Sequence, residues 1–321
     1  ALRLQNQNEM STSPLDAFVQ ETLAEHALDW CCCNGLNMRR KGGRSAGFVH
    51  VPVSLLPARL PRDSFALVEP LAGSWNELVH VLTRTAEGVA WLHATISTVV
   101  SSDAFTARLL EIAVAVDAAR VARSTAAPLH EQLSLFVFRS DYMLHQPEGS
   151  GADATPALLQ VELNTISCSF ATLSHLTTKL HRALMTVADE EGASELVDAH
   201  LGVSAENPRL EESEALPTNA APKGIASALI AAHRAYAACG AVGDLATAVV
   251  FVVQANETNV GDQRPIEYLL RAAAPAIEVL RLTLGELDAF SAGCADDAAG
   301  APLVLRPVAG VKGLRKAVEV S

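Results

Sequence analysis

The chain has 321 residues, of which 50% are hydrophobic, and its 36 acidic and 24 basic side chains give a formal net charge of −12. This composition excludes a wholly disordered chain, which would combine low hydrophobicity with high net charge. It also argues against a nucleic-acid partner, because binding to nucleic acid needs a basic surface. No apolar run reaches the roughly 20 residues of a membrane-spanning helix, so we predict no membrane partner either.

Alanine-rich segments with apolar residues three and four positions apart predict helices in the first half of the chain. We expect one helix over Val81–Ser102 and a second over Phe105–Arg123. Asp103 immediately precedes the second segment and is a candidate N-cap residue.

The pattern then changes to strands. Leu133–Arg139 and Ala157–Asn164 are predicted strands, and a loop with Pro147, Gly149 and Gly151 separates them. Such an arrangement favours an antiparallel pair with a long connection. Helical spacing returns over Phe170–Asp189.

Val203–Gly224 is rich in proline and glutamate, so we place the domain boundary there, with one region over 1–210 and the other over 211–321. The order beyond it is a helix, a strand, a helix and a strand: Ile225–Cys239, Thr247–Gln254, Ile266–Ala273 and Ile277–Leu284. This order predicts a βαβ unit with a parallel sheet. The predicted fold class is therefore α/β, with a helix-rich N-terminal region containing antiparallel strands and a βαβ substrate-binding domain.

The six cysteines include the consecutive Cys31–Cys33 and isolated Cys168, Cys239 and Cys294. They form neither a CxxC metal motif nor a spaced disulfide framework. We therefore expect reduced thiols in a cytoplasmic protein. A redox role for the three consecutive cysteines is the alternative.

Three segments carry candidate site residues. Glu162 and Asn164 alternate on one strand, so their side chains share a face, and a carboxylate beside an amide oxygen suits Mg²⁺. Any half-buried strand with a solvated face would show the same spacing. Arg139 can grip a carboxylate or phosphate with two hydrogen bonds, although a local surface pair with Asp141 is the commoner arrangement.

The third segment is the polar run Gln254–Arg264 at the carboxyl end of a buried strand. Ligands in parallel sheets bind at such ends, and several directed hydrogen bonds suit a polar, amino-acid-like ligand. The alternative is a polar loop that caps the following helix through Asp262. A glycine pattern at 149–154 matches a dinucleotide-binding motif by letters only, because a strand follows it instead of a helix.

Four blocks of the chain occur in the order and approximate spacing of one known family: Ser102–Leu109, Arg139–Met143, Glu162–Phe170 and Asn259–Arg264. The chain thereby resembles eukaryotic glutathione synthetase from about Asp103 onward. The resemblance implies an ATP-grasp ligase that uses ATP and Mg²⁺ to activate the C-terminal carboxylate of γ-glutamylcysteine as an acyl phosphate. The amine of glycine then attacks, and a homodimer is the implied assembly.

The resemblance also implies roles for individual residues. Glu162 and Asn164 would hold magnesium, and Glu162 would also contact ATP. The dipeptide site would be lined by Arg139, Ile166, Ser167, Cys168, Ser169, Glu257, Thr258, Asn259 and Gln263.

Members of the family are longer and carry a glycine-rich lid, nucleotide-gripping lysines and a further magnesium-binding glutamate in their late half. This C-terminal ATP-grasp half is absent from the present sequence. We therefore expect an amino-terminal fragment or one chain of a cleaved enzyme, completed by a companion C-terminal segment. The alternative is a non-catalytic assembly or scaffold subunit derived from the ligase fold.

Overall fold

The computed structural model describes residues 13–42, 44–122, 133–151, 156–204, 215–239, 245–291, 303–307 and 318–320. Cys294 and most of the proline- and glutamate-rich boundary segment lie outside these residues. The chain divides into two compact units that interleave along the sequence. Unit 1 comprises Ala1–Arg59, Ser169–Ile225 and Ala255–Leu269, and unit 2 comprises Leu60–Cys168, Ala226–Gln254 and Leu270–Ser321.

Unit 1 is built mainly from helices and one short hairpin. Its elements are α1 (Pro14–Phe18), the π-helical turn η1 (Val19–Leu23), α2 (Ala24–Asn34), β1 (Asn37–Arg39), the 3-10 turn η2 (Arg44–Ala46), β2 (Phe48–His50), α7 (Ala171–Glu190) and α8 (Ser194–Leu201). The unit also contains the first residues of α10 (Ala221–Ala238) and most of α11 (Val260–Ala273).

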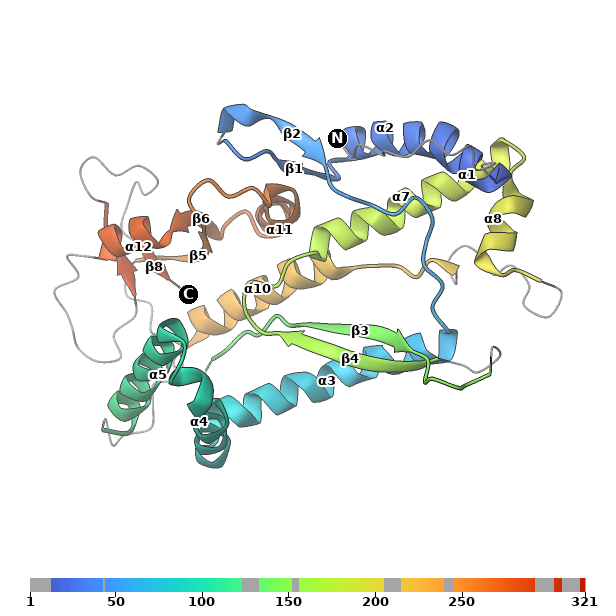
Figure 1. Ribbon diagram of the computed structural model, residues 1–321. Helices are drawn as coiled ribbons and strands as arrows, with labels where there is room; N and C mark the ends of the chain where they lie inside the picture. The colour runs from blue at the N-terminus through green and yellow to red at the C-terminus, as the bar shows by residue number, and fades with distance from the viewer. Residues whose placement is uncertain are drawn as a thin grey trace. The chain divides into compact units, whose positions relative to one another are not determined.

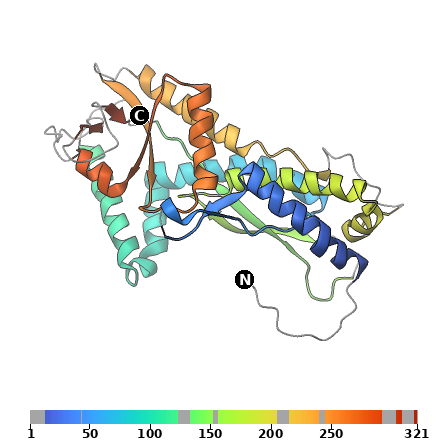
Figure 2. The ribbon, with the colours of Figure 1, turned by 90° about the horizontal axis from the view of Figure 1, so that it is seen from above.

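The core of unit 1 lies between α2 and α7, which run side by side (Figures 1 and 2). Leu23, Leu36, Leu180 and Leu184 are almost completely buried there. Burial of a leucine side chain contributes about 1.5–3 kcal/mol, so this contact explains why the two helices associate. The predicted helix Phe170–Asp189 is confirmed as α7, one residue later at each end.

Cys31 belongs to the same core, and its burial raises the pKa of the thiol, whereas Cys32 and Cys33 are exposed on α2. The three consecutive cysteines therefore differ in environment because a helix points successive side chains in different directions. All five cysteines in the described part of the chain are free thiols.

Three consecutive helices begin unit 2: α3 (Arg62–Arg84), α4 (Ala86–Val100) and α5 (Ala104–Ala122). The prediction of one helix over Val81–Ser102 is wrong, because Thr85 leaves the helical conformation and its hydroxyl accepts the backbone N–H of Gly88 at 3.0 Å. The hydroxyl thus caps α4 and ends α3. Asp103 is confirmed as a cap of α5, since its carboxylate accepts the backbone N–H of Thr106 at 2.9 Å.

Strands β3 (Arg139–His145) and β4 (Ala157–Asn164) pair antiparallel, as predicted. The predicted bounds of β4 are confirmed, but the strand predicted over Leu133–Arg139 is wrong, because β3 starts where that segment ends. The register explains the difference: β4 pairs from Ala157, opposite His145, to Asn164, opposite Arg139, with one unpaired residue, Val161, so β3 begins at Arg139. Trp75 of α3 donates a hydrogen bond to the hydroxyl of Tyr142 in β3 at 3.0 Å.

The second sheet of unit 2 has the strand order β6-β5-β8-β7. It is formed by β5 (Ala246–Val253), β6 (Glu278–Thr283), β7 (Val304–Leu305) and β8 (Val318–Val320), and α12 (Leu284–Ser291) follows β6. Strand β5 is parallel to β6 and β8. The predicted βαβ unit is therefore confirmed as β5-α11-β6, and the α/β fold class with it. No helix in the described residues is both long and apolar enough to cross a membrane.

Candidate active site

The register of β3 against β4 brings four polar side chains together on one face of unit 2. Arg139 lies opposite Asn164, and Asp141 lies opposite Glu162. Residues two apart on a strand share a face, so all four side chains project to the same side of the ribbon. Three of them, Arg139, Glu162 and Asn164, are predicted site residues, and Asp141 joins them.

Hydrogen bonds connect these four residues, which we call the β3–β4 cluster. Arg139 donates to both oxygens of Asp141, from Nε at 2.8 Å and from Nη2 at 3.0 Å. The amide nitrogen of Asn164 donates to Glu162 Oε1 at 2.9 Å and to Asp141 Oδ2 at 3.3 Å. Arg139 Nη2 also lies 3.8 Å from Glu162 Oε1. The local Arg139–Asp141 pair is thus formed, and it stands beside the carboxylate and amide.

The charges of the cluster stabilise one another. The hydrogen bonds to Asp141 raise the pKa of Arg139, with smaller contributions from Cys168 and Glu162. The guanidinium of Arg139 in turn holds the pKa of the Asp141 carboxyl below its usual range. Both groups are therefore charged at neutral pH, and the two-pronged pair fixes the plane of the guanidinium.

The lowered pKa of Asp141 predicts a pH-dependent contribution to stability. A carboxyl whose pKa is lower in the folded state stabilises the fold above its unfolded value of about 3.9, and this contribution disappears as pH falls through the folded value. We expect the melting temperature of Asp141→Asn to lie below that of the wild type at pH 6 and to approach it as pH falls toward 3.

The control for this series is Glu148→Gln in the loop between β3 and β4, where the carboxylate is exposed. Its melting temperature should follow that of the wild type at every pH. A difference between Asp141→Asn and the wild type that stays constant from pH 6 to 3 would contradict the role given to this pair.

The turn after β4 carries further predicted residues of unit 2. Ile166 is 83% exposed, and Ser167 is exposed with a positive φ of 52°, a conformation that L-residues adopt in tight turns. The thiol of Cys168 donates to the backbone oxygen of Asn164 at 2.9 Å and to that of Val137 at 3.2 Å. Cys168 therefore stabilises the turn, while the side chains of Ile166 and Ser167 are open to solvent.

The remaining predicted residues belong to unit 1. Ser169 is its first residue after the turn; Glu257, Thr258 and Asn259 come from the loop that leads into α11, and Gln263 lies in the first turn of that helix. Glu257 organises this loop, because its carboxylate accepts the backbone N–H of Asn259 at 2.8 Å and the side-chain amide of Gln263 at 3.1 Å. The loop is thus a compact set of polar groups.

Asp262, in the first turn of α11, is 3% exposed and connects this helix to α7. Its carboxylate accepts the backbone N–H groups of Phe170, Thr172 and Leu173 at 2.6, 2.8 and 3.1 Å. The hydroxyl of Thr172 donates to the backbone oxygen of Asp262 at 2.7 Å. Asp262 therefore caps α7, about 90 residues away in sequence, and the prediction that it caps the helix that follows it is wrong.

The predicted site residues accordingly form two groups, each defined within its own unit. Sequence reasoning treated Asp141 only as a surface partner of Arg139 and did not include it among the site residues. Its position two residues after Arg139 on the same strand was the available signal. The connection from Asp262 to Thr172 had no local signal, because it joins separate stretches of the chain.

The carboxylate of Glu162 and the amide of Asn164 are ligand types that suit magnesium, although here the amide nitrogen of Asn164, not its oxygen, faces Glu162. In the described residues, no three His, Cys, Asp or Glu side chains lie close enough together to hold a metal by themselves. Mg²⁺ commonly uses one or two protein oxygens and completes its shell with phosphate oxygens and waters. Glu162 and Asn164 are adjacent, and the side chain of Glu162 is 57% exposed, so it is accessible to such an ion.

Comparison with known proteins shows the family of the chain. Residues 18–314 match the family described as eukaryotic glutathione synthase, ATP binding domain. The chloroplastic glutathione synthetase of Solanum lycopersicum is 32% identical over 301 residues, which are 89% of this chain and 47% of that protein. The glutathione synthetase of Dictyostelium discoideum is 30% identical over 83% of this chain and 49% of its own length, and that of Homo sapiens is 28% identical over 83% and 48%.

A solved structure is similar as well. The apo form of a glutathione synthetase like-effector from Globodera pallida superposes with a TM-score of 0.51 over 84% of this chain and 51% of that chain. At 17% identity this likeness concerns the fold alone. The chain spans about half the length of the curated relatives it matches. The match over residues 18–314 shows that the chain belongs to the eukaryotic glutathione synthase family.

Proposed function

We propose that this chain contributes the dipeptide- and magnesium-binding strands of an ATP-dependent carbon–nitrogen ligase that makes glutathione. The single observation that carries the proposal is the β3–β4 cluster, in which Arg139 lies beside Glu162 and Asn164. A guanidinium that binds a carboxylate and side chains that suit Mg²⁺ are two of the groups that activation of a carboxylate with ATP needs. The free thiols support the predicted cytoplasmic location.

In the proposed reaction, an oxygen of the γ-glutamylcysteine carboxylate takes the γ-phosphoryl group of ATP, and ADP leaves. The amine of glycine then attacks the carbonyl carbon, loses a proton and displaces phosphate, so that the peptide bond of glutathione forms. Bound Mg²⁺ would neutralise the phosphate oxygens as charge moves between them.

The residues of the chain would position the reactants. Arg139 would hold the acidic dipeptide, and Asp141 would keep its guanidinium in the plane that two-pronged binding needs. Glu162 and Asn164 would hold the metal, with Glu162 also reaching ATP. Ile166, Ser167, Cys168 and Ser169 would line the dipeptide site from the turn. Glu257, Thr258 and Asn259 of the loop before α11, with Gln263 in the first turn of that helix, would hydrogen-bond polar groups of a substrate.

The exposed apolar surface of unit 2 supports the prediction of a companion segment. The helices α3 to α5 expose large apolar side chains, among them Leu67, Trp91 and Phe105, which is 72% exposed. Exposed apolar side chains gathered on consecutive elements mark surfaces that another polypeptide covers. Because the chain spans about half the length of its relatives, we infer that the other half of the ligase covers these helices. A homodimer, which the family resemblance implies, belongs to the same proposal.

The function is tested by measuring phosphate release from ATP with the protein and any polypeptide that co-purifies with it. We expect release to require Mg²⁺, γ-glutamylcysteine and glycine together, and omission of each should reduce it to background. A correctly folded complex that releases no phosphate with all components present would overturn the ligase proposal and support the scaffold alternative. Light scattering on the same sample tests the dimer.

A further inference from the structure

A basic pocket lies within unit 1. Its cavity has a volume of about 810 Å³, which is within the range of small-molecule sites. The 18 residues around it come from the end of α2, the β1–β2 hairpin, α7, the start of α10 and α11. None of the predicted substrate or metal residues is among them.

The charge of this pocket is opposite to that of the chain. Its described lining includes the cationic side chains of Arg39, Lys179, Lys223 and Arg264, together with His175, and no aspartate or glutamate is among these described residues. The low-dielectric walls of a pocket focus the electric field of the cations that line it, so these cations attract anions.

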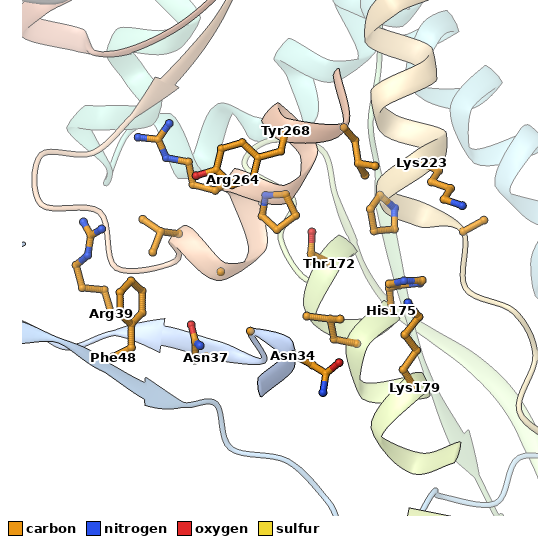
Figure 3. Close-up of a pocket in the computed structure, with 18 residues that line it drawn as sticks. Asn34, Asn37, Arg39, Phe48, Thr172, His175, Lys179, Lys223, Arg264 and Tyr268 are labelled. Atoms are coloured by element: carbon orange, nitrogen blue, oxygen red, sulfur yellow. The ribbon is translucent and has the colours of Figure 1, made fainter. Parts of the chain in front are cut away.

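The cations lie at two ends of the cavity (Figure 3). Arg39 and Arg264 stand toward one side of the view, and His175, Lys179 and Lys223 stand toward the other. Apolar side chains of the lining, including Leu176, Val260 and Leu269, complete the wall. The arrangement is complementary to a molecule with acidic groups at both ends and an apolar middle.

Arg39 has an unused donor. Its guanidinium lies over the ring of Phe48, with 5.6 Å from Cζ to the ring centroid, while its backbone N–H donates to the oxygen of Thr258 at 3.0 Å. Its Nε is buried and has no hydrogen-bond partner among the described residues. A buried donor without an acceptor is costly, and because this nitrogen is not accessible from the cavity, an anion there could meet Arg39 only through the terminal nitrogens of its guanidinium. Arg264 is held differently, by an ion pair of 2.7 Å with the fully buried Glu267.

Close contacts fix the two sides of the pocket. The backbone of Gly261 approaches that of Asn37 so closely that a Cβ at position 261 would overlap the Asn37 carbonyl oxygen. This contact sets β1, and thus Arg39, against the start of α11. On the other side, Asn219 before α10 donates to Ser174 Oγ at 2.8 Å and accepts from His175 Nδ1 at 2.5 Å. Because Nδ1 is used in this bond, Nε2 of His175 is available to a ligand.

We propose that this pocket is a binding site for a small organic dianion or polyanion, with phosphate or carboxylate groups at its two ends. None of the described lining residues is a proposed ligase residue, although Val260, Gly261 and Arg264 lie between or beside the proposed substrate residues Asn259 and Gln263 in sequence. The test below measures anion binding and not phosphate release, so failure of this proposal can be told apart from failure of the ligase proposal.

The test uses two probes, pyrophosphate and adipate, titrated into the purified protein by calorimetry at low ionic strength. Pyrophosphate tests for phosphate chemistry, and adipate tests for two carboxylates separated by an apolar chain. We expect saturable binding of at least one probe. The double variant Lys179→Ala/Lys223→Ala should weaken it at least about tenfold, because both substituted lysines line one end. Both lysines are exposed, so their loss should leave the melting temperature unchanged.

The matched control is Arg40→Ala/Lys41→Ala, which removes the same charge from exposed positions outside the lining. Its affinity for the probe should stay within about twofold of the wild type. The proposal is overturned if neither probe binds saturably, or if the control weakens binding as much as the pocket variant does. Equal loss in both variants would show that only the overall charge attracts the anion.

Discussion

Replacement of Asp262 by alanine is expected to lower the free energy of unfolding of unit 1 by about 3–5 kcal/mol, because three backbone N–H groups at the start of α7 lose a buried, charged acceptor. Phe170, which precedes α7, has a positive φ of 72°, and its N–H is one of the three groups. The carboxylate therefore helps to hold this conformation. Hydrogen exchange of the α7 amides measures the change, because exchange reports the opening of one region separately from the rest.

Two further variants calibrate this result. Asp262→Asn keeps the shape and one acceptor oxygen but loses the charge, so we expect a smaller loss of about 1–3 kcal/mol. Asp103→Ala removes an exposed helix cap in unit 2 and should cost less than Asp262→Ala. Protection of α7 that is the same in Asp262→Ala as in the wild type would show that the backbone of the helix start finds other partners.

Replacement of Glu162 by alanine is expected to reduce turnover of the intact ligase at least about 100-fold, equivalent to about 2.7 kcal/mol of transition-state stabilisation. The proposed reason is the loss of a metal ligand beside the phosphate groups. The side chain is 57% exposed, so the same substitution should change the free energy of unfolding by less than about 1 kcal/mol. Phosphate release and denaturant unfolding, measured on the same preparation, separate the two effects.

Glu148→Ala is the matched control, since it removes an exposed carboxylate from the loop between the same two strands. It should retain full turnover. A Glu162→Ala protein that keeps its activity but unfolds more easily would show that Glu162 serves the strand pair rather than the reaction.

Local sequence patterns were sufficient to predict features that lie within a single strand or helix. The bounds of β4 and the shared face of Glu162 and Asn164 follow from alternation alone, and the four-block resemblance led to the family that the comparisons show. The position of β3 did not follow, because Leu133–Arg139 is the more apolar segment. The pairing register of β4 instead selects the more polar residues from Arg139 onward.

Contacts between residues that are far apart in the sequence could not be predicted from local sequence patterns. Unit 1 is assembled from three separate stretches, so the pocket cations at positions 39, 179, 223 and 264 have no common sequence signal. The same holds for the contact of Asp262 with α7. The predicted division into 1–210 and 211–321 stays a prediction, and the two compact units that the contacts define interleave across it.

The central claim is that one face of the β3–β4 pair holds both the metal and the acidic dipeptide. The most direct measurement is turnover of the intact enzyme as a function of Mg²⁺ and of γ-glutamylcysteine, compared between Glu162→Gln and Arg139→Lys. The account predicts that Glu162→Gln raises the Mg²⁺ requirement, whereas Arg139→Lys raises KM for the dipeptide about tenfold or more because a lysine cannot bind a carboxylate with two parallel bonds. Unchanged Mg²⁺ and dipeptide dependence in both variants would contradict it.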